Sequence, residues 1–167
     1  MSDVPLESSA ASRPIAAVVW LVGAATLCLH ILTANGYGIF RDEMYYIMCS
    51  ERLDWGYVDH PPLSIAVLAL WRWVFGGSLM ALRMPPGLAH GALVVLFGFI
   101  ARELGAGKFG QAFAALVAAL MPVYLGTSSF YSMNALDSIF WAACVYVLCR
   151  IVATGNAKLW LLFGCLS

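Results

Sequence analysis

The sequence predicts an all-α integral membrane protein, a bundle of about four complete membrane-spanning helices and a partial fifth. Of its 167 residues, 62% are hydrophobic and 11% are charged, with a mean hydropathy of +0.85. Soluble domains carry roughly 45–50% apolar and about 25% charged residues. The nine basic and nine acidic residues cancel, and no basic run occurs. The composition therefore excludes a soluble domain and a nucleic-acid-binding protein.

Long runs with few or no charges fit the roughly 20 apolar residues that a helix needs to cross a bilayer. The predicted spans cover residues 14–34, 84–101, 109–136 and 134–153, and a fifth begins near Lys158. Pro14 fits the first turn of a helix, where the missing N–H is least costly. The third run is longer than a span needs, and Pro122 and the polar residues 126–129 indicate that its helix ends there.

The sequence allows a prediction for each end of the chain. Residues 1–13 are predicted to be a cytoplasmic tail. Residues 14–34 are predicted to be an anchor rather than a signal peptide, because the run exceeds about 7–15 residues and no A-x-A site follows. The last apolar run stops partway through a span at residue 167. We therefore expect residues 14–167 to be the N-terminal part of a longer domain. We also expect this chain on its own not to catalyse its reaction, because the opposite wall of a substrate cavity would come from further helices.

Residues 62–75 form a shorter apolar run of 14 residues, in which Arg72 lies between Trp71 and Trp73. This length and aromatic content are typical of a helix in the membrane interface, with Arg72 reaching lipid head groups. If the run does not span, one side of the membrane holds five basic residues: Arg13, Arg102, Lys108, Arg150 and Lys158. The other side holds four: Arg41, Arg52, Arg72 and Arg83. The positive-inside rule then predicts that the first loop, residues 35–80, is extracytoplasmic.

The first loop contains the residues of chemical interest, since five of the nine acids lie between positions 42 and 59. A short amphipathic helix at the membrane surface is predicted there, because apolar residues recur at helical spacing: Phe40, Met44, Ile47 and Met48. Asp42 and Glu43 fall in its first turn, where the helix dipole stabilises carboxylates. The pattern alone explains both acids without a catalytic role.

The cysteines and two of the histidines are predicted to be structural. Four cysteines fall in apolar segments and Cys49 stands alone in the first loop, so neither a disulfide framework nor a zinc site is indicated. His30 and His90 lie in apolar runs and are expected to be buried helix residues rather than metal ligands.

Six short motifs follow one another along the chain: Arg41-Asp-Glu-Met-Tyr-Tyr46, Asp59-His-Pro-Pro-Leu63, Phe75-Gly-Gly-Ser78, Ala81-Leu-Arg-Met-Pro85, Ala101-Arg-Glu-Leu-Gly105 and Tyr131-Ser-Met-Asn-Ala-Leu-Asp137. In this order and spacing they resemble the GT-C membrane glycosyltransferases. The branch they resemble groups protein O-mannosyltransferase-like, aminoarabinose transferase-like and RgtA/B/C/D-like bacterial enzymes. The resemblance covers about residues 14–155 and implies a GT-C-like bundle whose first extracytoplasmic loop contains interfacial helices.

The resemblance implies transfer of a sugar from a polyprenyl-phosphate donor to a hydroxyl of a lipid, glycan or protein acceptor. The resemblance also implies a multi-pass protein of a bacterial inner membrane that contacts membrane lipids. A hydroxyl is a poor nucleophile until a carboxylate takes its proton, whereas the phosphate leaves already ionised. One carboxylate then suffices, which predicts inversion at the anomeric carbon. The resemblance assigns this base to Asp42, with Glu43 orienting it or binding sugar.

Four further residues are predicted to bind substrates: Asp137, His60, Tyr45 and Arg83. Asp137 would complete an acceptor or metal site with Asp42, or be a solvated charge at a helix start. His60 would bond the donor's sugar or phosphate, or brace the turn before the prolines that follow it. Tyr45 suits sugar stacking or an interfacial aromatic belt, and Arg83 suits the lipid phosphate.

Some enzymes of this kind use a divalent metal, but the sequence shows no ligand cluster, so no cofactor is assigned. Two other classes stay open. One is a transporter or flippase-like protein, which would favour charges at the centres of spans and paired discontinuous helices, neither of which the sequence indicates. The other is a non-catalytic membrane subunit.

Overall fold

The structure is a computed structural model that describes residues 14–166, so the predicted tail at residues 1–13 lies outside the described residues. The described part is all helical, which confirms the predicted class. Its helices are α1 (Ala17–Thr33), α2 (Arg41–Ser50), α3 (Pro62–Phe75), α4 (Leu79–Glu103), α5 (Lys108–Leu120), α6 (Pro122–Thr127), α7 (Met133–Thr154) and α8 (Leu159–Leu166).

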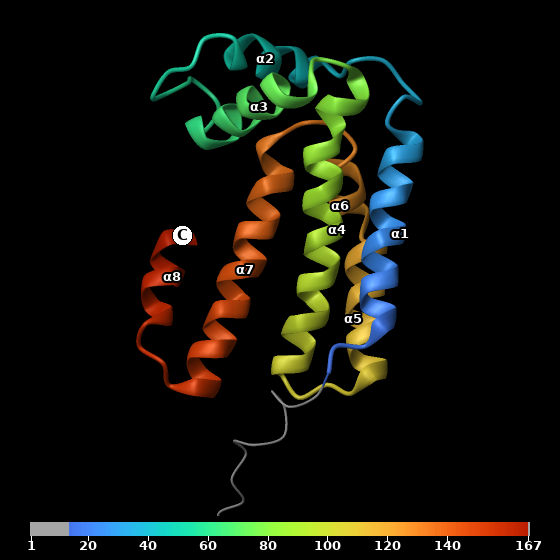
Figure 1. Ribbon diagram of the computed structural model, residues 1–167, viewed down its shortest axis with the longest axis vertical. Helices are drawn as coiled ribbons and strands as arrows, with labels where there is room; N and C mark the ends of the chain where they lie inside the picture. Colours follow the sequence, from blue (N-terminus) through green and yellow to red (C-terminus); the bar gives the residue numbers. More distant parts are fainter. Residues whose placement is uncertain (1–13, 167) are drawn as a thin grey trace, which may run out of the picture.

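Two parts can be distinguished in Figure 1. The helices α1, α4, α5 and α7 run side by side along the long axis, with α4 in contact with the other three. We call these four helices the stem. The helices α2 and α3 lie across one end of the stem. Together with the connecting segments 34–40, 51–61 and 128–132, they form what we call the transverse layer.

Two helices, α4 and α7, are long and apolar enough to cross a membrane. The helices α1, α3 and α5 are apolar but shorter, and α8 turns back alongside α7. The predicted count of four complete spans and a partial fifth therefore stays a prediction. Helix α3 covers residues 62–75, the range predicted from the sequence, and α7 begins and ends within one residue of the predicted 134–153.

Helix α4 begins at Leu79, earlier than the predicted Met84, and continues through Pro85 and Pro86. Its start is capped by Ser78, whose Oγ accepts a hydrogen bond from the Ala81 N–H at 3.1 Å. Pro85 has no N–H to donate to the Ala81 carbonyl, and Trp71 Nε1 donates to that carbonyl instead, at 2.8 Å. The prediction was wrong because a neighbouring helix supplies the donor that the proline lacks.

Pro122 interrupts the third apolar run, as predicted, between α5 and α6. The Ala118 carbonyl, which the N–H of residue 122 would otherwise reach, is bonded to His90 Nε2 at 3.1 Å. A carbonyl only accepts, so His90 donates through Nε2, and its Nδ1 is bonded to His30 Nε2 at 2.8 Å. Both histidines are buried, as predicted, and His90 satisfies a carbonyl that the proline leaves free.

The stem and the transverse layer have separate buried cores. The core of the stem is made of small apolar residues: Ala16, Val19, Val94, Ala115, Ala118 and Ala119. A Cβ added at Gly98 would lie 2.5 Å from Val19 Cγ1, so α1 approaches α4 too closely for a side chain there. The core of the layer has bulkier side chains, some of them aromatic: Tyr46, Ile65, Leu68, Leu82 and Tyr131.

Candidate active site

Helix α2 turns a polar face into the protein. Its buried residues are Glu43, Tyr46 and Ser50, whereas Met44 and Met48 are 56% and 68% exposed. The spacing of three and four residues places the buried polar groups on one side of the helix. Helix α2 therefore contributes buried hydrogen-bonding groups to the layer, in addition to the Tyr46 ring in its core.

Glu43 is fully buried and its carboxylate accepts four hydrogen bonds. Oε1 accepts from Arg83 Nε at 3.0 Å and from the Tyr131 N–H at 3.1 Å. Oε2 accepts from Arg83 Nη2 at 2.9 Å and from the Phe40 N–H at 2.8 Å, which caps α2. A carboxylate has about four acceptor sites, so this one is saturated.

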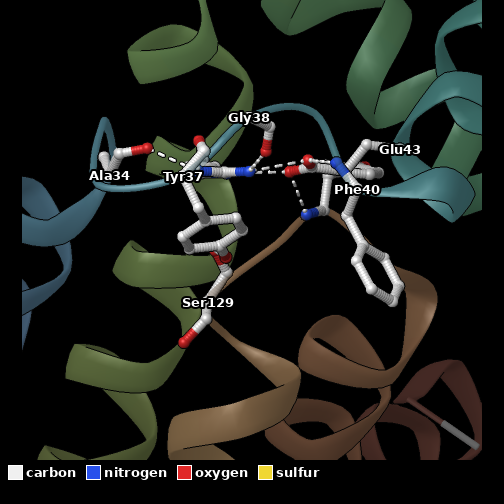
Figure 2. Close-up of polar contacts among 8 residues, drawn as sticks. Ala34, Tyr37, Gly38, Phe40, Glu43 and Ser129 are labelled. Atoms are coloured by element: carbon white, nitrogen blue, oxygen red, sulfur yellow. Dashed lines mark hydrogen bonds and ion pairs between the residues drawn. The ribbon is translucent and has the colours of Figure 1, made fainter.

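Arg83 is the partner of Glu43 and is also buried. Its remaining N–H groups donate to three carbonyls, those of Ala34 at 2.5 Å, Tyr37 at 3.2 Å and Gly38 at 2.8 Å. Figure 2 shows these carbonyls converging from the segment after α1, opposite Glu43 and Phe40. All five guanidinium N–H groups have acceptors, which offsets the cost of burying the charge. A substrate phosphate would have to displace one of them.

Two tyrosines connect the segment between α6 and α7 to its surroundings, Tyr37 next to the ion pair and Tyr131 to α3. The Tyr37 ring lies 3.8 Å beneath the Arg83 guanidinium, and its hydroxyl donates to the Ser129 carbonyl at 2.5 Å. The Tyr131 hydroxyl donates to the Ser64 carbonyl at 2.6 Å. Burial raises the pKa of both tyrosines, so both stay protonated donors at neutral pH.

Asp42 adjoins Glu43 but lies about 100° further round the helix and has a different environment. Its side chain is 43% exposed, and its ion pair is with Arg41 at 3.3 Å, whose side chain is 91% exposed. Such a pair contributes little to stability. Asp42 therefore keeps acceptor sites for a substrate hydroxyl, which Glu43 does not.

Tyr46 lies one turn after Asp42 on α2 and is hydrogen-bonded to the start of α7. Burial raises the pKa of Tyr46; a hydrogen bond from Met133 opposes this shift, and the Asp42 charge adds to it. The Tyr46 hydroxyl accepts the Met133 N–H at 2.9 Å and lies 3.0 Å from His60 Nδ1. The structure thus places Asp42 and His60 around one buried tyrosine at the start of α7.

His60 is half-buried among aromatic rings. Its ring stacks on that of Tyr46 with centroids 4.1 Å apart, and the Tyr45 centroid lies 5.0 Å away. Of the residues predicted to bind substrates, His60 and Tyr45 are therefore neighbours. Arg83 lies apart from them in its own ion pair.

Asp137 is exposed and lies one turn into α7. It lines a groove of about 510 Å³ between the starts of α3 and α7 and the end of α8. Ser64 and Asn134 are polar residues of the lining, while Leu136 and Phe140 are among the apolar ones. The groove thus combines polar groups near the transverse layer with an apolar wall along α7.

Sequence reasoning missed three partnerships of the layer. It assigned Tyr46 and Tyr131 no bonding role and did not pair Glu43 with Arg83. A signal was present, because Glu43, Tyr46 and Ser50 form a polar stripe at helical spacing. Arg72, predicted to reach head groups, donates to the end of α2, to Ser50 Oγ at 2.6 Å and the Ile47 carbonyl at 3.2 Å. Its contact with head groups stays a prediction.

No group of three or more His, Cys, Asp and Glu residues that could hold a metal ion occurs among residues 14–166. Comparison with known families gives a match over residues 59–167 to the family described as dolichyl-phosphate-mannose-protein mannosyltransferase. The matched region includes α3 to α8, with His60, Arg83 and Asp137, and begins after α2. No curated protein and no solved structure matches the chain.

Proposed function

Because the chain belongs to the dolichyl-phosphate-mannose-protein mannosyltransferase family, we propose that the transverse layer transfers a sugar from a polyprenyl-phosphate donor to an acceptor hydroxyl. Membership makes the protein a membrane glycosyltransferase of the GT-C type. The donor, the stereochemistry and the catalytic base are parts of our proposal, as are a multi-pass topology and a bacterial inner membrane.

The observation that carries the proposal is the contrast between two adjacent carboxylates. Glu43 is saturated by four donors, while Asp42 is partly exposed beside the same rigid framework. A general base must have a free lone pair within reach of the proton that it takes. Asp42 meets this requirement, so we assign the base to Asp42 and a positioning role to Glu43 and Arg83.

The step proposed for Asp42 is a single displacement. The carboxylate takes the proton of the acceptor hydroxyl as its oxygen attacks the anomeric carbon of the sugar. The bond between that carbon and the phosphate oxygen breaks, and polyprenyl phosphate leaves with the electron pair. Attack from the face opposite the leaving group inverts the anomeric configuration.

We place the donor in the groove between α3, α7 and α8. A sugar offers hydroxyl groups to Asn134 and Asp137, and the lipid chain would follow the apolar wall formed by Leu136 and Phe140. The volume of about 510 Å³ lies within the roughly 300–1,000 Å³ of typical ligand pockets. In this arrangement Asp137 binds substrate and Asp42 reacts with it.

We further propose that the transverse layer is extracytoplasmic and that the 104–107 turn is cytoplasmic. Val58 is 92% exposed in the layer and Gly107 lies at the opposite end of the stem. In a cysteine-free variant, an impermeant thiol reagent should label Val58→Cys in intact cells and leave Gly107→Cys unlabelled. The reverse pattern would overturn the orientation and the side on which transfer is proposed.

The function is tested in a full-length context, in nanodiscs, by offering a panel of polyprenyl-phosphate sugars with acceptors. We expect acceptor-dependent release of polyprenyl phosphate, and an inverted linkage in the product by NMR. Asp137→Asn should raise the KM for the donor, whereas Asp54→Asn, an exposed acid of the same layer, should match the parent. Movement of intact donor between leaflets without any release would favour a flippase-like protein instead.

A further inference from the structure

The hydroxyl of Tyr46 has a defined direction of hydrogen bonding. Tyr46 is 1% exposed, and its oxygen receives the Met133 backbone N–H, which can only donate. The proton of Tyr46 is therefore available to the other partner, His60 Nδ1, at 3.0 Å. The stacking of the two rings, 22° from parallel, holds the imidazole in place.

Ser64 is a second oxygen near Tyr46, and its hydroxyl donates to the Pro61 carbonyl at 2.9 Å. An imidazole nitrogen is a stronger acceptor than a serine hydroxyl, so the Tyr46 hydroxyl donates its hydrogen bond to His60 Nδ1. A neutral histidine carries one proton on its ring, and with Nδ1 accepting, that proton is on Nε2. Pro61, the residue after His60, lines the groove between α3, α7 and α8, which Asp137 also lines.

We propose that Tyr46 is a positioning residue for His60, which it fixes in the tautomer that presents Nε2–H to the phosphate oxygen of a lipid-phosphate donor. This inference rests on the proposed function, since the phosphate belongs to its donor. As the bond to the anomeric carbon breaks, negative charge grows on that oxygen, and a pre-oriented N–H stabilises it. His60 contacts the substrate, and Tyr46 acts through His60.

The tautomer can be measured without any turnover. The chain has three histidines, so ¹⁵N-histidine labelling gives three ring systems, and His60→Gln identifies the signals of His60. At a pH where His60 is neutral, we expect a protonated Nε2 and an unprotonated Nδ1. Tyr46→Phe should produce a mixture of tautomers. Tyr131→Phe, which removes another buried hydroxyl of the layer, should leave the His60 signals unchanged.

A protonated Nδ1 in the parent would mean that Tyr46 gives its proton to Ser64, and it would overturn the proposal. So would His60 signals that do not change in Tyr46→Phe. Because the measurement reports on the ring itself, it gives a result even if no donor is turned over. A failure of the proposed function and a failure of this inference can thus be distinguished.

Activity provides the second readout. Tyr46→Phe should lower kcat about 10-fold with little change in KM, because the contact forms mainly in the transition state. Tyr57→Phe, which loses a hydroxyl bonded to the Arg52 carbonyl in the same layer, should match the parent. In a His60→Gln background, whose amide supplies a donor without a tautomer, Tyr46→Phe should have no further effect on kcat. A full 10-fold loss in that background would show that Tyr46 does not act through His60.

Discussion

The stem and the transverse layer are held together in different ways. In the stem, alanine, valine and glycine bring helices into close contact, and buried His90 satisfies a carbonyl left free by a proline. In the layer, a buried arginine and glutamate bind the backbone of segments that have no helical hydrogen bonds of their own. In the stem, polar side chains bond carbonyls that prolines leave free within the helices. In the layer, they hold separate segments of the chain together.

This difference explains how the layer can hold the carboxylate that we propose as the base. Loop segments expose backbone donors and acceptors that must be satisfied when they are buried. Glu43 and Arg83 satisfy them and in doing so fix the start of α2. Asp42, the residue before Glu43 on the helix, is held in a defined position while its side chain stays 43% exposed. A stem built from apolar contacts offers no such position.

The largest effect is expected from Arg83→Met, which leaves Glu43 as an uncompensated buried charge. Breaking a buried ion pair in this way costs about 3–5 kcal/mol. We expect denaturant unfolding in detergent to show this loss, with faster amide exchange in residues 34–46. Arg41→Met removes an exposed pair and should leave both measurements unchanged. Equal effects of the two variants would remove the distinction between the layer's framework and its surface.

The next effect tests the stem. Gly98→Ala places a methyl group 2.5 Å from Val19 Cγ1, and such overpacking costs roughly 1–3 kcal/mol. Thermal unfolding should shift downward while amide exchange in α2 stays at the parent rate. At Gly126 an added Cβ meets nothing within 4 Å, so Gly126→Ala is the matched control. An unchanged or higher melting temperature of Gly98→Ala would show that α1 and α4 are less closely packed than described.

A smaller effect is expected for the histidine pair of the stem. A double-mutant cycle with His30→Leu and His90→Leu should give a coupling of about 0.6–1.7 kcal/mol, the range found for hydrogen bonds between membrane helices. This value should fall below the cost of Arg83→Met. A coupling as large as that cost would mean that polar contacts organise the stem as strongly as the layer.

The smallest effect concerns alkaline pH. Burial raises the pKa of Tyr46 and Tyr131 above the ordinary value of 10.0, so the unfolded chain loses these protons first. The stability that these two tyrosines contribute should be constant below pH 10.0 and fall as the pH rises above it. Denaturant midpoints across this range measure the decline, which should be shallower in Tyr131→Phe. A midpoint that rises above pH 10.0 would contradict the assigned burial.

The helices could be predicted because apolar runs and prolines are local signals. The ranges of α3 and α7 follow from them, and so does the interruption at Pro122. The start of α4 could not be predicted, because the hydrogen bond from Trp71 to the Ala81 carbonyl depends on how two helices pack. In the candidate site, too, local sequence predicts one part and packing decides the other. Asp42 and Glu43 look alike in sequence, and a rotation of about 100° decides which one is buried.

The account depends most directly on the separate roles of these two acids. The decisive measurement compares release of polyprenyl phosphate and melting temperature in Asp42→Asn and Glu43→Gln. We expect Asp42→Asn to keep the parent's melting temperature and to lose on the order of 10²–10⁴-fold in rate. Glu43→Gln should lower the melting temperature, because its amide cannot accept all four donors. Parent-like turnover in Asp42→Asn, together with a stable and inactive Glu43→Gln, would reverse the roles and contradict the account.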